Sequence, residues 1–419
     1  MDLRELKALE IAAKAKITYT DGLWSVPSQT SPGTSYRVRL GDPISCTCDD
    51  FATRRQACKH VVACRIVLSR DGMGTAPVIV TDAVPRKPTY RQDWPAYGRA
   101  QATEKRRVRV LLQDLTRTLP DRERPPSRSG PKPHHVRDMV FAMAYKVYCG
   151  LSSRRFSTDL LEAFERGFTS RPIPGAKVPA FFEDSYLTPI LKGLICHSAR
   201  PLRSVESSFA IDSSGFSSSR FERHFDVKYG VTQTQAIWVK VHLATGTKTN
   251  VVTAVRILDK DAGDCPQFVP LVKETRKHFE IGEVSADKAY ASLENFEEVA
   301  GCGGQAFIAF KSNATGAIGG QFEKAFHFFQ FKRDEYLDRY HRRSNVESTF
   351  SAIKRKFGHS VLSKTDAAMT NEVLCKILCH NLTCLVQEQE SLGIAPIFWG
   401  EERDEQADEP MILPMASVQ

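Results

Sequence analysis

The spacing of hydrophobic positions predicts a small mixed unit at the N-terminus. Residues 2–16 have the pattern of a short helix, and the apolar pieces at 23–27 and 35–40 are typical of strands. A cysteine-rich turn follows, and then an apolar helix over 59–68. We therefore expect residues 1–70 to fold as one unit.

Helical spacing covers the segment 134–200. It predicts three helices, at 135–149, 153–167 and about 180–197. Four cations flank the second helix and the turn after it: Arg154, Arg155, Arg171 and Lys177. A small helical DNA-binding unit fits this pattern, and so does a plain three-helix bundle.

From residue 207 onward, strand patterns alternate with helical patterns. The expected strands are 207–211, 236–244, 250–258, 282–286 and 305–310. The expected helices are 266–279, 293–299 and a long stretch over 323–357 that is broken once. The elements follow in the order strand, strand, strand, helix, strand, helix, strand, helix. This order is typical of an α/β fold with a mixed five-stranded sheet.

The remaining segments differ in composition from these folded parts. Residues 71–133 are rich in proline, arginine and glycine, so we expect a linker with one helix near 103–117. Residues 391–419 form an acidic tail that we expect to be disordered. Residues 201–390 then make up the α/β domain.

Composition limits the class of protein. Hydrophobic residues make up 42% and charged residues 26%, as in globular proteins. No window approaches the roughly 18–20 uncharged apolar residues of a membrane span, and the charged start Met1–Leu6 does not resemble a signal peptide. Eleven cysteines, an odd number, argue against a disulfide framework. We expect a protein with no membrane partner, in the reducing cytoplasm.

Net charge is unevenly distributed. The whole chain carries +9, and residues 86–137 alone contain 14 Lys or Arg against 5 Asp or Glu. A basic belt of this kind indicates a polyanion partner, although a solvated linker has the same appearance.

Two aspartates lie at the ends of predicted strands. Asp212 follows the apolar run 208–211 and precedes Ser-Ser-Gly, and Asp287 closes the run 284–286. An acid at the end of a buried strand is costly without a partner, and oxygen ligands suit Mg²⁺ or Mn²⁺. Each aspartate by itself is also typical of a helix cap or a turn.

A third acid lies on the edge of a predicted helix. At about 100° per residue, Tyr340, Arg343, Glu347 and Lys354 fall within an arc of about 60°, beside an apolar stripe that can pack on a sheet. An ordinary surface stripe with an Arg343–Glu347 ion pair explains part of this pattern. Three carboxylates from separate elements could instead clamp two divalent ions for phosphodiester chemistry, with the cations holding DNA phosphates.

The spacing Tyr-x2-Arg-x3-Glu-x6-Lys resembles the signature of insertion-sequence transposases with a DDE active site. The segments 210–216 and 286–290 resemble the first two catalytic motifs of that family, with Ala289 where the family often has glycine. The resemblance covers about residues 134–390. It implies a ribonuclease-H-like fold, two Mg²⁺ or Mn²⁺ ions on Asp212, Asp287 and Glu347, and DNA contacts from Tyr340, Arg343 and Lys354. Only residues 311–322 separate the last strand from the long helical stretch, so the β insertion of some relatives is absent.

Two short ligand pairs lie in the N-terminal unit. Cys46-Thr47-Cys48 and Cys58-Lys59-His60 provide four ligands that suit one tetrahedral Zn²⁺. Cys64, one helical turn after His60, competes as a ligand. The Cys-x-Cys-x9-Cys-x-His pattern resembles a SWIM-type zinc finger, which implies a surface for DNA or protein and no catalysis.

Three functional hypotheses follow. The first is a nucleoid-associated transposase that binds transposon ends in double-stranded DNA, cuts and rejoins strands, and acts as a homodimer in the DNA complex. The second is a host nuclease or resolvase of the same fold, and the third is a non-catalytic, domesticated DNA-binding protein. The three acids argue against the third. The Tyr-Arg-Glu-Lys resemblance is what favours the first over the second.

Overall fold

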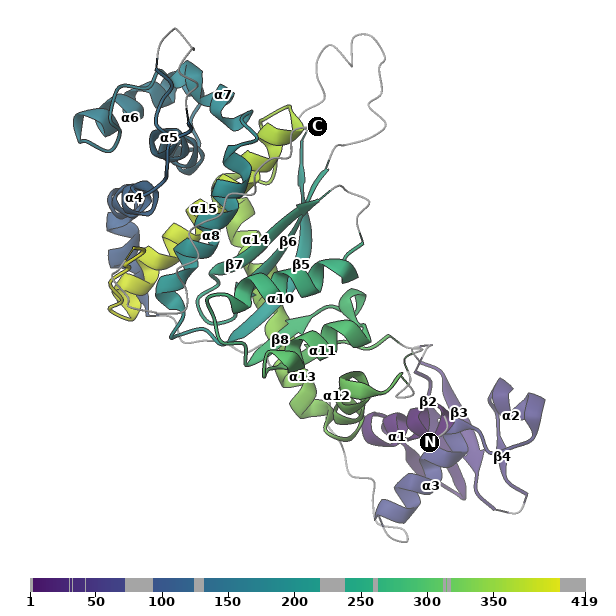
Figure 1. Cartoon of the computed structure of the whole chain (residues 1–419). Helices are drawn as coiled ribbons and strands as arrows, with labels where there is room; N and C mark the ends of the chain where they lie inside the picture. The colour runs from purple at the N-terminus through teal and green to yellow at the C-terminus, as the bar shows by residue number, and fades with distance from the viewer. Residues whose placement is uncertain are drawn as a thin grey trace, which may run out of the picture. The chain divides into compact units, whose positions relative to one another are not determined.

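The computed structural model describes most of the chain (Figure 1). The described residues are 3–71, apart from positions 30, 32 and 42, and 93–123, 132–218, 238–258, 263–311, 314 and 318–399. They form two compact units, Met1–Thr89 and Tyr90–Gln419, which we treat separately. Within the described ranges, each helix is too short or too polar to cross a lipid bilayer.

The N-terminal unit combines an antiparallel sheet with three helices. The strands lie in the order β1 (Thr18–Thr20), β2 (Leu23–Pro27), β3 (Ser35–Arg39) and β4 (Ser45–Cys46). The helices are α1 (Leu3–Lys14), α2 (Asp49–Arg54) and α3 (Lys59–Asp71). Asp21 and Gly22 both have positive φ, 50° and 79°, as a tight two-residue hairpin between β1 and β2 requires. The fully buried Ile11, Val26 and Val61 form part of the core.

The larger unit is built on a mixed five-stranded sheet, which confirms the predicted class. Its strands are β5 (Ser208–Ser217), β6 (Trp238–Gly246), β7 (Val252–Leu258), β8 (Glu283–Ala286) and β9 (Gln305–Ile308). They lie in the order β7-β6-β5-β8-β9. The β7, β6 and β5 neighbours are antiparallel, whereas β8 and β9 extend the sheet in parallel from β5. The connections to β8 and β9 run through α10 (Phe268–Arg276) and α11 (Leu293–Gly301).

A group of helices packs beside this sheet (Figure 1). It contains α4 (Trp94–Thr116), α5 (Val136–Cys149), α6 (Ser153–Glu165), α7 (Val178–Phe182), α8 (Leu187–Ala199) and α15 (Asp366–Ser391). Helix α15 is buried along most of its length and contacts α4, α5 and α8. Asn381 of α15 bonds to both backbone groups of Val252 in β7, at 2.8 and 2.7 Å. The helical region therefore shares one core with the sheet.

The expected linker is shorter than the sequence analysis predicts. Residues 94–116 form one continuous helix, α4, with Ala100, Leu112 and Leu115 buried in the core of the larger unit. This segment resembled a linker because it is rich in cations. Those cations form ion pairs with acids from distant elements. Arg99 and Arg107 both pair with Glu390, at 2.8 and 2.5 Å.

The start of the expected disordered tail is also folded. Phe398 is buried, and the indole nitrogen of Trp399 donates to the backbone oxygen of Asp114, at 2.9 Å. These contacts attach the residues after α15 to α4. The acidic part of the tail, residues 400–419, lies outside the described residues.

Two other boundaries differ from the predictions. The third helix of the 134–200 region is two helices, α7 and α8. The long helical stretch consists of α12 (Gly320–Phe331), α13 (Arg333–Tyr340) and α14 (Ser344–Phe357), with a single 3-10 turn at His341–Arg343. The stretch is thus interrupted twice, at Lys332 and before Ser344, rather than once.

Candidate active site

The sheet register brings Asp212 and Asp287 to adjacent positions. Strands β5 and β8 pair in parallel as far as Ile211 and Ala286, and the two aspartates are the next residues on each strand. Neighbouring strands lie about 4.8 Å apart, so the two backbones are close here. The prediction that Asp212 ends its strand is wrong. Strand β5 continues to Ser217 because it remains paired with β6 after its pairing with β8 has ended.

Glu347 reaches the same region from α14, which packs against β5 and β6. The buried Val346, Phe350 and Ile353 form the apolar side of this helix. Arg343 joins the elements, because its guanidinium lies 2.8 Å from Asp212 and 2.7 Å from Glu347. The structure therefore brings one predicted cation and two predicted acids into direct contact.

The pKa of Asp212 is affected by burial and by the charged groups around it. Burial raises the pKa of the Asp212 carboxyl, and the negative charges of Asp287 and Glu347 act in the same direction. A hydrogen bond from the backbone amide of Ser213 and the positive charge of Arg343 oppose the rise. Asp212 thus lies within the electrostatic range of both other acids.

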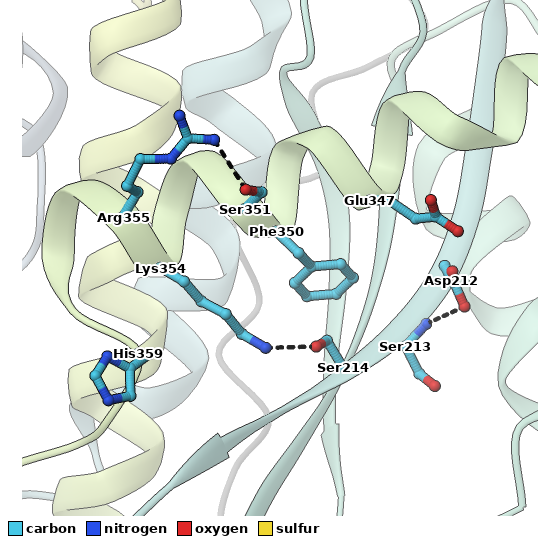
Figure 2. Close-up of a pocket in the computed structure, with 9 residues that line it drawn as sticks. All are labelled: Asp212, Ser213, Ser214, Glu347, Phe350, Ser351, Lys354, Arg355 and His359. Atoms are coloured by element: carbon cyan, nitrogen blue, oxygen red, sulfur yellow. Dashed lines mark hydrogen bonds between the residues drawn. The ribbon is translucent and has the colours of Figure 1, made fainter. Parts of the chain in front are cut away.

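An open pocket of about 520 Å³ lies between β5 and α14 (Figure 2). Asp212 and Glu347 lie at one end, and Lys354 extends from α14 toward β5, where its Nζ donates to Ser214 Oγ at 2.7 Å. Arg355 and His359 also line the pocket. Carboxylates at one end and cations at the other suit a ligand that carries both metal ions and phosphates.

In the N-terminal unit, the four predicted zinc ligands lie together. Cys46, Cys48, Cys58 and His60 are all buried, and their ligand atoms lie within 4.8 Å of one another. The sulfurs of Cys46 and Cys58 are 3.8 and 3.9 Å from His60 Nδ1. Cys64 is buried but does not belong to this group. Three sulfurs and one imidazole nitrogen are a donor set that fits tetrahedral Zn²⁺.

Two segments of the chain match known protein families. Residues 203–382 match the transposase DDE domain, and residues 36–63 match the SWIM zinc finger. The chain carries a transposase DDE domain behind a SWIM zinc finger. No curated protein and no solved structure matches the chain.

The mixed sheet and its helices are the ribonuclease-H-like fold expected of a DDE domain. Strand β9 is followed directly by the segment leading to α12, so the described residues after β9 contain no inserted sheet. The predicted Tyr-Arg-Glu-Lys stripe does not lie on one helix. Tyr340 ends α13, Arg343 lies in the 3-10 turn, and Glu347 and Lys354 lie on α14. The interruption keeps Arg343 beside Glu347 and turns it toward Asp212.

The acids of the DDE domain fit a hard cation by their chemistry, because carboxylate oxygens suit Mg²⁺ and Mn²⁺. They are not gathered as tightly as the ligands of the SWIM finger. The Arg343 guanidinium lies between two of them and already supplies one positive charge there. A divalent ion on Asp212 and Glu347 would therefore compete with this side chain for the negative charge of the two acids.

A second polar cluster lies beside Asp212, and it was not predicted from the sequence. Asp264, at the start of the turn before α10, pairs with Lys240 of β6 at 2.6 Å. His242 of β6 is fully buried, and its Nδ1 lies 3.1 Å from the hydroxyl of Tyr290. These residues come from three distant segments, and no local motif connects them. In the sequence, Tyr290 closes the segment 286–290 that resembles the second catalytic motif, and His242 is a lone histidine in a predicted strand.

Proposed function

We propose that this chain is a transposase that binds transposon ends and catalyses divalent-metal-dependent strand cleavage and strand transfer. Two observations support the proposal, in a domain that matches the transposase DDE domain. The β5–β8 register places Asp212 and Asp287 next to each other in the sheet, and Arg343 contacts both Asp212 and Glu347. The family match favours this function over a host nuclease of the same fold.

In this proposal Asp212, Asp287 and Glu347 hold the metal ions. Two divalent cations bound there would activate the attacking oxygen and stabilise the leaving oxygen of the phosphodiester. Asp212 is fixed by the Ser213 amide, and Asp287 by the amide of Lys288 at 2.7 Å. Glu347 is more exposed, with 56% of its side chain accessible, and it pairs with the side chain of Arg343. It is therefore the acid that is best able to adjust its position to the metals and the DNA.

The cations of the site act on the DNA backbone. Lys354 is held by Ser214 at one end of the pocket and stands over the Phe216 ring, 5.3 Å from its centroid. Burial lowers the pKa of Lys354, which makes a phosphate partner favourable for its charged form. Tyr340 is half-buried next to Arg343, where its hydroxyl can add a phosphate contact. We assign Tyr340, Arg343 and Lys354 to the positioning of the transposon end.

The other parts have supporting roles in this proposal. The SWIM finger holds one structural zinc on Cys46, Cys48, Cys58 and His60 and offers a surface to DNA or protein. The helices of the 134–200 region contribute to DNA binding, and the active complex is a homodimer on double-stranded DNA. Target DNA is the second substrate, since strand transfer requires one.

An assay with Mn²⁺ and a duplex carrying the element's own end tests the proposal, with cleavage, joining and binding followed separately. We expect Asp212→Asn, Asp287→Asn and Glu347→Gln to abolish cleavage and leave end binding within about twofold, because these changes remove charge from the metal site only. Glu335→Gln, on the exposed face of α13, is the matched control and should cleave normally. Cleavage without any joined product would instead identify a nuclease. Full activity in Glu347→Gln would refute the site.

A further inference from the structure

The strand pairing does not itself set the distance between Asp212 and Asp287. The ladder between β5 and β8 ends at Ile211 and Ala286, one residue before each aspartate. Beyond that point β5 follows β6, while the chain after Asp287 turns into the 3-10 segment Lys288–Tyr290. The register places the two acids next to each other, and contacts beyond the ladder can fix their exact separation.

A buried hydrogen bond spans this gap. Tyr290 lies three residues after Asp287, and its backbone amide donates to the Asp287 carbonyl, at 3.0 Å. Its side chain is 1% exposed, and its hydroxyl lies 3.1 Å from Nδ1 of His242. His242 is the cross-strand partner of Ser213, the residue directly after Asp212. The Tyr290–His242 pair thus connects the turn that carries Asp287 to the strand pair that carries Asp212.

The surrounding groups keep both members of this hydrogen bond uncharged. Burial raises the pKa of Tyr290, and the charges of Asp264, Asp212 and Asp287 add to the rise, so the phenol stays protonated. Burial lowers the pKa of His242 to about 4, so the imidazole is neutral. The neutral imidazole carries one proton, so its tautomer decides which of the two groups donates in this hydrogen bond.

The far side of the imidazole faces an acid. His242 Nε2 lies 3.8 Å from Asp264, too far for a direct hydrogen bond, and finds no hydrogen-bond partner among the described residues. Asp264 also accepts a hydrogen bond from Ser213 Oγ at 3.4 Å and pairs with Lys240 at 2.6 Å. The imidazole is thus held by its hydrogen bond to the phenol, and the Asp264 carboxylate lies on its other side without bonding to it directly.

Independent contacts hold the tyrosine in place. Asn295, which is 1% exposed, donates to the Tyr290 carbonyl at 2.6 Å. The Tyr290 ring packs against Phe268 of α10, with the ring centroids 5.9 Å apart. The phenol therefore approaches His242 from a rigid base, and the pair is suited to transmit position.

We propose that Tyr290 and His242 are positioning residues that set the separation of Asp212 and Asp287 for the binding of divalent metal. This rests on the proposed metal role of the two aspartates. Neither residue contacts the reacting atoms, so their loss acts on metal affinity and not on the chemical step. Partners that orient metal ligands typically contribute about 10- to 100-fold in metal affinity or activity.

The test is Tyr290→Phe in the full-length, zinc-loaded protein, with Mn²⁺ binding followed by the electron paramagnetic resonance signal of free Mn²⁺. We expect about a tenfold loss of Mn²⁺ affinity. Cleavage should need about tenfold more Mn²⁺ for half its maximal rate, and should return to within twofold of wild type at saturation. An effect on folding alone would lower the rate at every Mn²⁺ concentration.

Tyr336→Phe is the matched control. Tyr336 is also fully buried, and its hydroxyl makes two hydrogen bonds to the backbone of Ile308, at 2.8 and 3.0 Å, away from His242 and Asp264. This variant loses at least as much buried hydrogen bonding and should bind Mn²⁺ within twofold of wild type. If the two variants bind Mn²⁺ equally well, or if Tyr290→Phe loses rate at all Mn²⁺ concentrations, the positioning role is refuted.

Variants of His242 test the other half of the pair. His242→Asn keeps a polar group near the position of Nδ1 and should retain more Mn²⁺ affinity than His242→Leu. The double variant Tyr290→Phe/His242→Leu should be no weaker than His242→Leu, because one connection is removed in both. If the losses of Mn²⁺ affinity in the two single variants add up in the double variant, Tyr290 and His242 do not act as one connected pair.

The two proposals fail in different ways. If wild type binds Mn²⁺ and Asp212→Asn does not, while Tyr290→Phe binds like wild type, the positioning role fails and the proposed function stands. If Mn²⁺ binding and cleavage are absent from wild type, or are unaffected in Asp212→Asn, both fail.

Discussion

Arg343 Nη1 lies 2.8 Å from Asp212 Oδ2, although 131 positions separate the two residues in the chain. The other terminal nitrogen of the same guanidinium lies 2.7 Å from Glu347. One cation therefore neutralises two of the three acids that we assign to metal binding. In the proposed mechanism this cation moves from the acids to a DNA phosphate when the end and the metals bind.

Replacing Arg343 should change metal binding and DNA binding in opposite directions. We expect Arg343→Ala to bind Mn²⁺ more tightly than wild type in the absence of DNA, because a competing cation is removed. A half-buried ion pair worth about 1 kcal/mol corresponds to about a fivefold change. The same variant should bind the cleaved end more weakly or join it more slowly. Titrations with Mn²⁺ and with end duplex, done separately, measure both effects.

Lys354→Ala is the control for that experiment. Lys354 lines the same pocket but bonds to Ser214 and not to an acid. It should weaken end binding and leave Mn²⁺ affinity without DNA unchanged. If Arg343→Ala lost Mn²⁺ affinity, the guanidinium would be supporting the metal site rather than competing for it.

The SWIM finger should depend on one zinc ion held by four ligands. Cys46→Ala or Cys58→Ala should lose the zinc and unfold the N-terminal unit, because the free energy of metal binding is part of the folding free energy of so small a unit. Cys64→Ala should keep one zinc per chain, since Cys64 stands outside the ligand group. Elemental analysis together with circular dichroism measures both properties. Zinc loss in the Cys64 variant alone would reassign the fourth ligand.

The basic belt should divide into DNA-binding and structural cations. Arg86, Lys87 and Arg91 precede α4, whereas Arg99 and Arg107 already pair with Glu390. Replacing the first three by alanine should reduce the slope of log affinity against log salt by up to about 3, because each phosphate that a cation no longer neutralises lowers the slope by roughly one unit. The Arg99→Ala/Arg107→Ala variant should change the slope less and lower the unfolding temperature. An equal slope in wild type and the triple variant contradicts a DNA role for this segment.

Buried histidines should make the larger unit sensitive to acid. Burial lowers the pKa of His380 to about 4, from an ordinary value near 6.5. Between these values the unfolded state binds more protons, so stability is complete above about pH 6.5 and is lost as the pH falls toward 4. At pH 5 the loss from this residue is about 2 kcal/mol. Burial lowers the pKa of His242 and His197 to about 4 as well, and both add to the effect.

His380→Gln tests this contribution. Glutamine can still donate to the Asn250 carbonyl, which His380 Nε2 meets at 2.9 Å, but does not titrate. Denaturant unfolding at pH 7 and pH 5 should show a smaller loss of stability in this variant than in wild type. His327→Gln, at an exposed position on α12, should behave like wild type. Equal pH dependence in all three proteins would assign the acid sensitivity to other groups.

Local patterns were sufficient to single out the candidate zinc ligands and the stripe that contains Glu347. Cys46, Cys48, Cys58 and His60 are close in sequence, and their spacing alone predicts a shared ion, as the buried cluster now supports. The five strands of the larger unit were recognisable because each is a run of apolar residues bounded by turn signals. The residue stripe with Glu347 was recognisable because helical periodicity persists across the short 3-10 turn.

Long-range pairing explains what the patterns missed. In α4, apolar residues such as Leu112 and Leu115 alternate with cations, and the acids that neutralise those cations lie on α6 and α15. The segment therefore resembled a linker. Residues 213–217 resembled a turn because Ser-Ser-Gly is typical of turns, yet β6 provides hydrogen-bonding partners that keep them in the strand.

The amino-acid order alone was enough to indicate the candidate groups, which are three carboxylates, a line of cations and a set of zinc ligands. Each group was recognisable because a few neighbouring residues define it. Which of these groups meet became visible only in the folded chain. The contacts between Arg343 and Asp212, and between Tyr290 and His242, join segments 131 and 48 positions apart. Such contacts depend on strand register and on how α14 packs on the sheet. Both are collective properties of the core, and no local spacing of residues encodes them.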